Sequence, residues 1–291
     1  MKELRKISII GIGLLGGSIG LTVSRAIGGI KTAGYSHRAA TRRKARKLAV
    51  VTEVFDDIKK SVCDADLVIL ATPICTFEET FRAIADALPD GCIVTDVGST
   101  KSLPHQWAAK RLPGKVHYAG SHPIAGSEQR GVEFARDDLF ERSLCILTTT
   151  SKTDKETVQT LKKFWSALGC YVKIMTPAEH DKIFAGVSHL PHITAAALIN
   201  VNDSETLKYA GKGFIDTSRI ASGPANIWAD VFATNADNTV KEIDKLADEL
   251  RRLKKAIKSR DRKQIEKLLR KAADKRVEMI NYKVRKKEII S

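Results

Sequence analysis

The feature that most constrains the fold of this 291-residue chain is a glycine-rich turn close to its N-terminus. The turn, residues 11–16, follows a short apolar stretch at 6–10 and overlaps the start of a helical pattern at 15–27. Glycines at its first, third and sixth positions permit a tight turn, close approach to a phosphate, and close packing of the helix on the strand. Backbone amides at the start of the helix would then face the phosphates. We expect a dinucleotide to contact Gly11, Gly13, Leu14, Leu15 and Gly16.

Strand and helix patterns alternate through the first half of the chain. Apolar stretches predict strands at 6–10, 30–35, 67–71, 92–96, 116–119, 144–148 and 171–174. Helical patterns are found at 15–27, 41–48, 77–88, 103–111 and 154–168. An alternation of this kind is typical of a parallel sheet that helices cover on both faces.

The composition of the sequence changes after Pro177, where strand patterns end and alanine, leucine, lysine and glutamate dominate. We expect long helices at about 177–201, 224–256 and 261–287. The chain is therefore predicted to be α/β, with a Rossmann-type dinucleotide-binding domain at 1–175 and an all-α domain at 176–291. Because the predicted helices carry apolar stripes on more than one face, we expect the second domain to form a homodimer as well as to bind substrate.

The net charge of +15 is concentrated near the C-terminus. Residues 251–291 hold 17 Lys/Arg and 5 Asp/Glu, so +12 of the excess lies there. This stretch also has helical apolar spacing, and we interpret its charge as the solvated face of a basic helix. We therefore expect no nucleic-acid partner, and an anionic partner for this helix stays the alternative.

Hydrophobic residues make up 43% of the chain, which is enough for a buried core. No stretch approaches 18 uninterrupted apolar residues, and the N-terminus does not read as a secretory leader, so we expect no membrane span and a cytoplasmic location. The cysteines are odd in number and contain no Cys-x-x-Cys pair, which favours buried free thiols. They are Cys63, Cys75, Cys92, Cys145 and Cys170.

The end of the second expected strand bears on the choice between NAD and NADP. Positions 34–43 hold no carboxylate of the kind that binds the ribose of NAD and would repel a 2′-phosphate. Ser36 and Arg38, with His37 between them, could hold that phosphate instead. We therefore expect NADP, with NAD as the alternative. The arginines of this segment would otherwise lie on the solvated start of a helix.

Polar residues follow several later strands, at the sheet edge where ligands of open α/β folds bind. We expect the nicotinamide side of the cofactor to meet Thr72, Pro73 and Ser99. His122 follows the strand at 116–119, within the polar run 120–128. An imidazole titrates near neutral pH, so His122 is a candidate general base, whereas a lone His-Pro in a loop is often a packing or capping histidine.

The helical domain contributes two histidines and an arginine. His189 and His192 are three residues apart and share one face of the expected helix, which Pro191 should distort. His180 and Asp181 could join them around a metal, but no glutamate completes a known ligand spacing, so we expect no metal. Arg219 lies between expected helices, where its planar guanidinium suits a carboxylate, unless it is a plain surface residue.

These motifs together resemble the prephenate and arogenate dehydrogenases, which carry out oxidative decarboxylation in tyrosine biosynthesis. The resemblance covers about residues 6–235 and rests on the joint order of the motifs. They are the glycine-rich turn, Asp96–Lys101, Gly120–Glu128, Pro177–Asp181, Ser188–His192 and Thr217–Ile220.

The resemblance implies a role for each site residue. His122 would accept the proton of the ring C4 hydroxyl as hydride leaves C4. Ser99 would help to hold both His122 and the hydroxyl in position. Arg219 would bind the ring carboxylate, and His192 would approach the side-chain carboxylate of prephenate. The residues implied to line the site or support it are Ser127, Glu128, His189, His180 and Asp181.

Within the family, we expect prephenate as the substrate, with arogenate or both substrates as the alternative. Two readings from outside the family are another two-domain dehydrogenase of the β-hydroxyacid type and a non-enzymatic NAD(P)-binding regulator. The first relies on a lysine in the helical domain, for which this sequence shows no comparable motif. Turnover of prephenate separates the expected function from both.

Overall fold

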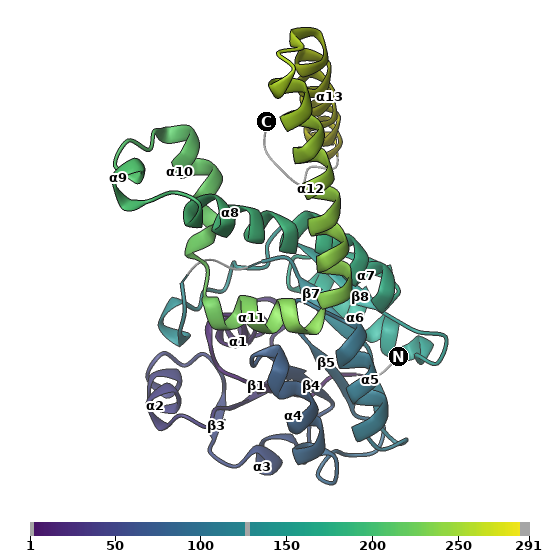
Figure 1. The fold of residues 1–291 in the computed structure, drawn as a ribbon. Helices are drawn as coiled ribbons and strands as arrows, with labels where there is room; N and C mark the ends of the chain where they lie inside the picture. The colour runs from purple at the N-terminus through teal and green to yellow at the C-terminus, as the bar shows by residue number, and fades with distance from the viewer. Residues whose placement is uncertain (1–2, 126–128, 286–291) are drawn as a thin grey trace. The chain divides into compact units, whose positions relative to one another are not determined.

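Six parallel strands form the main sheet of the computed structural model, which describes residues 3–125 and 129–285 (Figure 1). The strand order is β3-β2-β1-β4-β5-β6, and every neighbouring pair is parallel. This order reverses between β1 and β4, as in dinucleotide-binding folds. The strands are β1 (Lys6–Ile10), β2 (Lys31–Tyr35), β3 (Glu53–Phe55), β4 (Leu67–Leu70), β5 (Ile93–Asp96) and β6 (His117–Tyr118).

The predicted alternation of strands and helices is confirmed in this part of the chain. The connecting helices are α1 (Leu14–Ala26), α2 (Ala39–Lys47), α3 (Ile58–Val62), η1 (Ile74–Thr76), α4 (Phe77–Ile84) and α5 (Ser102–Arg111). Sequence patterns missed β3 and α3, which are only three and five residues long. Elements this short carry too few side chains to show a period, and α3 depends on its Asp57 N-cap.

Each face of the main sheet buries its own apolar core, because successive strand residues point to opposite sides. On one face, Ile9 and Ile69 pack with residues of α1 and α6 (Lys155–Ala167). On the other face, Ile10 and Leu70 pack with residues of α4 and α5. Both faces are therefore dry, and the ligand edge is left at the carboxyl ends of the strands.

A second sheet corrects the prediction of one all-parallel sheet. It contains β7 (Gly120–Pro123), β8 (Leu144–Thr148) and β9 (Tyr171–Met175), and β7 runs antiparallel to β8. The segment η2 (Val132–Phe134) lies between β7 and β8 in the chain. His122 is opposite Ile146 in this pairing, so it belongs to a strand and not to the loop that was predicted. The strand was missed because the chain passes from β6 to β7 through Ala119 alone, without a turn signal.

The helical segment after β9 starts where it was predicted but is more broken. Thr176 and Glu179 form a reciprocal capping box with Pro177 in the first turn, which fixes the helix start. The elements are α7 (Pro177–Phe184), π-helical η3 (Ala185–His189), α8 (Leu190–Asn200), α9 (Ser204–Leu207), α10 (Lys212–Ser218), η4 (Arg219–Ser222) and α11 (Ala225–Thr234). The expected distortion at Pro191 is confirmed, because a π-helical turn immediately precedes its helix.

The chain divides into two compact units, Met1–Asn235 and Ala236–Ser291. The predicted boundary at residue 175 falls inside the first unit, where strands give way to helices. The second unit consists of α12 (Ala236–Lys258) and α13 (Arg262–Arg285), which pack against each other. The predicted single helix at 224–256 ends instead at Asn235, whose backbone leaves the helical region.

The helical segment Pro177–Asn200 is long and apolar enough to cross a membrane by length and composition alone. Core helices meet the same criterion, and this one carries the buried polar residues His180, Asp181 and His192. All five cysteines are free thiols, as predicted. The prediction that all are buried is wrong for Cys63 and Cys75, which are exposed.

Candidate active site

The glycine-rich turn has the geometry that its sequence predicts. Gly11 adopts a φ of +102°, and a Cβ there would lie 2.6 Å from the carbonyl oxygen of Ala71. A Cβ on Gly16 would lie 2.0 Å from the carbonyl oxygen of Gly11. Neither position therefore accepts a side chain without moving backbone, which explains the first and third glycines of the motif.

Gly13 has a different reason to be glycine. A Cβ at this position would meet no atom of residues 3–125 and 129–285 within 4 Å, so packing among these residues does not require the glycine. Gly13 is also the N-cap residue of α1, and as a glycine it has no side chain to cap the amides of that helix. Open space in front of uncapped helix amides suits a phosphate, so the turn fits the pyrophosphate of a dinucleotide.

The end of β2 presents Ser36 and two arginines. Ser36 is nearly buried, and its Oγ accepts a hydrogen bond of 3.3 Å from the backbone N–H of Arg38. The guanidinium of Arg42 donates to the carbonyl oxygens of Ser36 and His37, at 2.8 and 3.0 Å. Arg42 therefore holds the loop in place, while the side chain of Arg38 is exposed and its Nε donates to Nε2 of His37, at 3.3 Å.

The loops after β4 and β5 lie at the same edge of the main sheet. Thr72 is half-buried, and its hydroxyl pairs with that of Thr76 at 2.8 Å, while Pro73 is exposed. Ser99 is half-buried in the loop between β5 and α5. These three residues are placed where a cofactor could meet them, and their contacts with one stay a prediction.

His122 projects from β7 into a cluster of rings. Its Nδ1 lies 2.8 Å from Nε2 of His180, and its ring centroid lies 4.9 Å from that of Phe184. The residue as a whole is half-buried. Burial of the ring, together with nearby His180, Lys101 and His189, holds the pKa of His122 well below its usual value near 6.5. A neutral imidazole is the form that can accept a proton.

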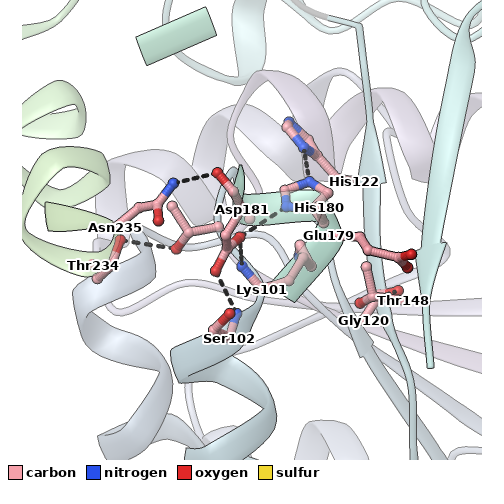
Figure 2. A network of polar contacts seen from close by, with 12 residues as sticks. Lys101, Ser102, Gly120, His122, Thr148, Glu179, His180, Asp181, Thr234 and Asn235 are labelled. Atoms are coloured by element: carbon pink, nitrogen blue, oxygen red, sulfur yellow. Dashed lines mark hydrogen bonds and ion pairs between the residues drawn. The ribbon is translucent and has the colours of Figure 1, made fainter. Parts of the chain in front are cut away.

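Behind His122 stands a buried pair from α7, His180 and Asp181 (Figure 2). Nδ1 of His180 lies 2.8 Å from Oδ1 of Asp181, and the two side chains are 0% and 1% exposed. The carboxylate of Asp181 also accepts hydrogen bonds of 2.8 Å from the backbone N–H groups of Lys101 and Ser102. Asp181 thus caps α5 through bonds between residues about eighty positions apart.

The pKa values of this pair move in the directions that their partners dictate. Burial lowers the pKa of His180, although the hydrogen bond to Asp181 opposes that shift. Burial alone would raise the pKa of Asp181, but hydrogen bonds from His180 and Ser102 hold it below its usual value. The pair is therefore a neutral imidazole beside an ionised carboxylate at neutral pH.

Lys101 ties the strand of His122 to the main sheet. Its side chain is fully buried, and its ammonium forms an ion pair with Asp96 at the end of β5. The same ammonium donates to the carbonyl oxygen of Ser121, at 2.6 Å. Because Ser121 directly precedes His122, this buried cation fixes β7 at the carboxyl edge of β5. The histidine therefore stands at the edge that also carries the glycine-rich turn.

His192 and His189 lie in an aromatic cluster at the junction of η3 and α8. The ring of His192 stacks on Trp228, with centroids 3.8 Å apart and planes 12° from parallel. Its Nδ1 is buried and has no hydrogen-bond partner among the described residues. Nδ1 of His189 lies 3.3 Å from Nδ2 of Asn235, which also donates to the carbonyl oxygen of Asp181. Burial lowers the pKa of His192, and it lowers that of His189 to about 4.

The remaining predicted residues are less closely tied to this group. Arg219 is exposed at the start of η4, a segment that packs against α8. Ser127 and Glu128 lie outside the described residues. Over residues 3–125 and 129–285, no three His, Cys, Asp or Glu side chains gather in a way that could hold a metal ion.

The sequence did not reveal the residues that hold His122 in position. It did not single out Lys101, although the run Asp96–Lys101 was recognised as a motif. It implied that Asp181 and His180 are supporting groups without identifying what they support. Asn235 gave no signal, because nothing in its neighbourhood distinguishes it from a polar residue at the end of a helix.

Comparisons with known proteins agree with this geometry. Residues 19–174 match the family described as prephenate dehydrogenase, nucleotide-binding domain, and residues 176–271 match its dimerization domain. A prephenate dehydrogenase of Bacillus subtilis is 33% identical, over 93% of this chain and 75% of its own length. A cyclohexadienyl dehydrogenase of Zymomonas mobilis is 30% identical, over 90% of this chain and 91% of its own length. The crystal structure of Aquifex aeolicus prephenate dehydrogenase with hydroxyphenyl propionate and NAD+ superposes with a TM-score of 0.90 at 33% identity, covering 96% of this chain and 99% of that one.

Proposed function

This chain belongs to the prephenate dehydrogenase family, and we propose that it converts prephenate to 4-hydroxyphenylpyruvate by NAD(P)-dependent oxidative decarboxylation, a step of tyrosine biosynthesis. The observation that carries the proposal is the position of His122. A neutral histidine is anchored at the carboxyl edge of a parallel sheet, the edge at which a dinucleotide-binding turn follows β1. A proton acceptor beside a redox cofactor is what oxidation of an alcohol requires.

Each site residue has a separate role in the proposed reaction. The bound nicotinamide supplies the acceptor for the hydride of ring C4. His122 takes the proton of the C4 hydroxyl through Nε2, since its Nδ1 is engaged by His180. Arg219 pairs with the ring carboxylate that leaves as carbon dioxide, and Ser99 helps to hold the hydroxyl. Aromatisation drives the decarboxylation, so the protein has mainly to orient the substrate and to accept the proton.

The direct test is to mix the protein with prephenate and NADP+ or NAD+ and to follow the absorbance of the reduced cofactor. The expected result is turnover that stops when either prephenate or cofactor is left out. A matched control is the Gly16→Ala variant, whose Cβ would collide with the carbonyl oxygen of Gly11 and block the turn. No reduced cofactor with either dinucleotide would overturn the assignment.

We further propose that NADP is preferred over NAD. Arg38 supports this preference because its side chain is exposed and its backbone N–H donates to Oγ of Ser36, while no carboxylate occupies positions 34–43. The neighbour from Aquifex aeolicus is in complex with NAD+, so NAD is the alternative cofactor. The test compares kcat/KM for the two cofactors in the unaltered chain, in Arg38→Ala, and in Lys47→Ala as a control at the far end of α2. A preference for NAD+ in the unaltered chain, or equal effects of the two substitutions, would refute the role of Arg38.

Prephenate is proposed over arogenate on the strength of His192. The two substrates differ at one side-chain position, which is a keto group in prephenate and an ammonium in arogenate. Because burial lowers the pKa of His192, repulsion between two cations contributes little at neutral pH. The preference depends instead on the cost of burying an ammonium beside the stacked rings of His192 and Trp228.

Parallel assays with both substrates test this preference. A higher kcat/KM for prephenate is expected, and His192→Ala should narrow the difference because it opens space and admits water. An equal or higher kcat/KM for arogenate would refute this preference, and would favour a cyclohexadienyl dehydrogenase activity, for which the relative from Zymomonas mobilis is named.

We also propose a homodimer formed by residues after 175. The helices of this part expose large apolar side chains that a monomer would leave in water. They include Val187, Val201, Ile215, Leu250 and Leu269. A match to a dimerization domain over residues 176–271 supports the same conclusion.

A further inference from the structure

We propose that Asp181, acting through His180, is a positioning residue that sets the tautomer of His122, with its proton on Nδ1 and a free lone pair on Nε2. The geometry of the relay stands without reference to any substrate, and only its catalytic consequence rests on the proposed function. Figure 2 shows the three side chains joined one to the next, with dashed lines from Asp181 to His180 and from His180 to His122.

The first step is that the carboxylate of Asp181 can only accept hydrogen bonds. Its two carboxylate oxygens face the backbone N–H groups of Lys101 and Ser102, both at 2.8 Å, at the N-terminus of α5. Backbone N–H groups cannot reverse their polarity, and the positive end of the helix dipole also favours a negative charge there. A protonated Asp181 would lose part of this capping, so the carboxylate stays ionised and presents an acceptor to His180.

The second step transfers this polarity to His180. Nδ1 of His180 lies 2.8 Å from an oxygen that has no proton to give, so Nδ1 must carry the proton. In a neutral imidazole the other nitrogen, Nε2, then carries a lone pair. The side chain is 0% exposed, so water cannot reach it to supply a different partner.

The third step fixes His122 in the same way. Nδ1 of His122 lies 2.8 Å from Nε2 of His180, which carries a lone pair, so Nδ1 must donate the hydrogen bond. The Nε2 atom of His122 is left unprotonated. A histidine without such a partner would distribute its proton between the two nitrogens, and every molecule protonated on Nε2 would be unable to accept a proton from a substrate hydroxyl.

The decisive measurement is the histidine nitrogen spectrum of the unaltered protein, recorded by long-range proton–nitrogen NMR on chain labelled with 15N-histidine. His122→Asn and His180→Gln spectra assign the two signals by their disappearance. Both residues are expected as Nδ1–H tautomers at neutral pH. A protonated Nε2 on neutral His122 would overturn the relay, whether or not the protein turns over prephenate, so this result is independent of the proposed function.

Two substitutions at His180 give the kinetic arm. His180→Leu removes the acceptor for Nδ1 of His122, and kcat is expected to fall about 10²–10⁴-fold, because a wrongly oriented histidine tautomer costs about this much in other enzymes. His180→Gln keeps an acceptor, since its side-chain carbonyl can take the place of Nε2. Its kcat should therefore be at least about a tenth of that of the unaltered enzyme. The KM for prephenate should change less than about threefold in both.

A purely structural role for His180 predicts a different outcome. The two variants would then lose activity in proportion to their loss of stability, measured by urea unfolding, and the tautomer of His122 would be unchanged in His180→Leu. That pattern would overturn the proposal. If His180→Leu does not fold, the spectrum of the unaltered chain and the activity of His180→Gln decide the question.

Discussion

Replacing His122 by asparagine removes the proton acceptor while keeping most of what holds the side chain. The amide of asparagine reaches the position of Nδ1, so it can still donate to Nε2 of His180, a bond that spans 2.8 Å in the native protein. The imidazole edge that faces away from His180, including Nε2, has no counterpart in asparagine. The substitution therefore separates proton transfer from local structure.

The size of the effect follows from this geometry. Loss of a general base reduces kcat about 10²–10⁴-fold, which raises the barrier by about 2.7–5.5 kcal/mol. The stability loss should be smaller, about 0.5–1.5 kcal/mol, since the main loss is the ring contact between His122 and Phe184 at 4.9 Å. Cofactor binding should change little, because the substitution leaves Gly11, Gly13 and Gly16 of the glycine-rich turn unaltered.

The assay measures kcat and KM with prephenate, and cofactor affinity by fluorescence titration, in His122→Asn and in His37→Asn as an exposed control. In the unaltered enzyme, kcat/KM should stay constant as the pH falls from 8 to 6.5. His122 loses its free lone pair on Nε2 when the imidazole becomes a cation, and burial holds the pKa for that step well below 6.5. A decrease in kcat of less than tenfold in His122→Asn, or a kcat/KM that halves at pH 6.5 in the unaltered enzyme, would refute the reasoning.

Three further outcomes can be checked independently. Arg219→Ala should raise the KM for prephenate strongly with little change in unfolding, because Arg219 is exposed and its loss leaves the ring carboxylate unpaired, which costs about 2–5 kcal/mol once the bound substrate excludes water; an unchanged KM would move the carboxylate site elsewhere. The free energy of unfolding should fall as the pH drops from 6.5 towards 4, because burial lowers the pKa of both His105 and His189 to about 4. In this pH range the unfolded chain binds a proton at each histidine while the folded chain does not, so the loss reaches up to about 2.7 kcal/mol per pH unit. Urea unfolding at pH 7 and pH 5 measures this, and equal midpoints would contradict it. Light scattering should give a dimer at micromolar concentration, and a monomer alone would contradict the proposed homodimer.

The sequence alone determined the features that depend on neighbours along the chain. The glycines of the turn can be predicted because the local backbone requires them: Gly11 has a φ of +102°, and a Cβ on Gly16 would collide with the carbonyl oxygen of Gly11. The strands of the main sheet other than β3 can be predicted because burial on both faces makes them short apolar runs. The start of α7 is readable because Thr176 and Glu179 cap it within one turn. In each case the physical cause acts over a few residues.

Only the tertiary structure decided how the catalytic histidine is held. His122 is paired with a residue 58 positions away, and Asp181 caps a helix that begins about eighty positions before it. The buried ammonium of Lys101 joins two strands from different sheets by bonding to Asp96 and to the carbonyl of Ser121. A hydrogen bond between distant side chains imposes no period on the sequence and no preference on the residues beside it. The partners of the base, and through them the nitrogen that it presents, are therefore fixed by packing between elements.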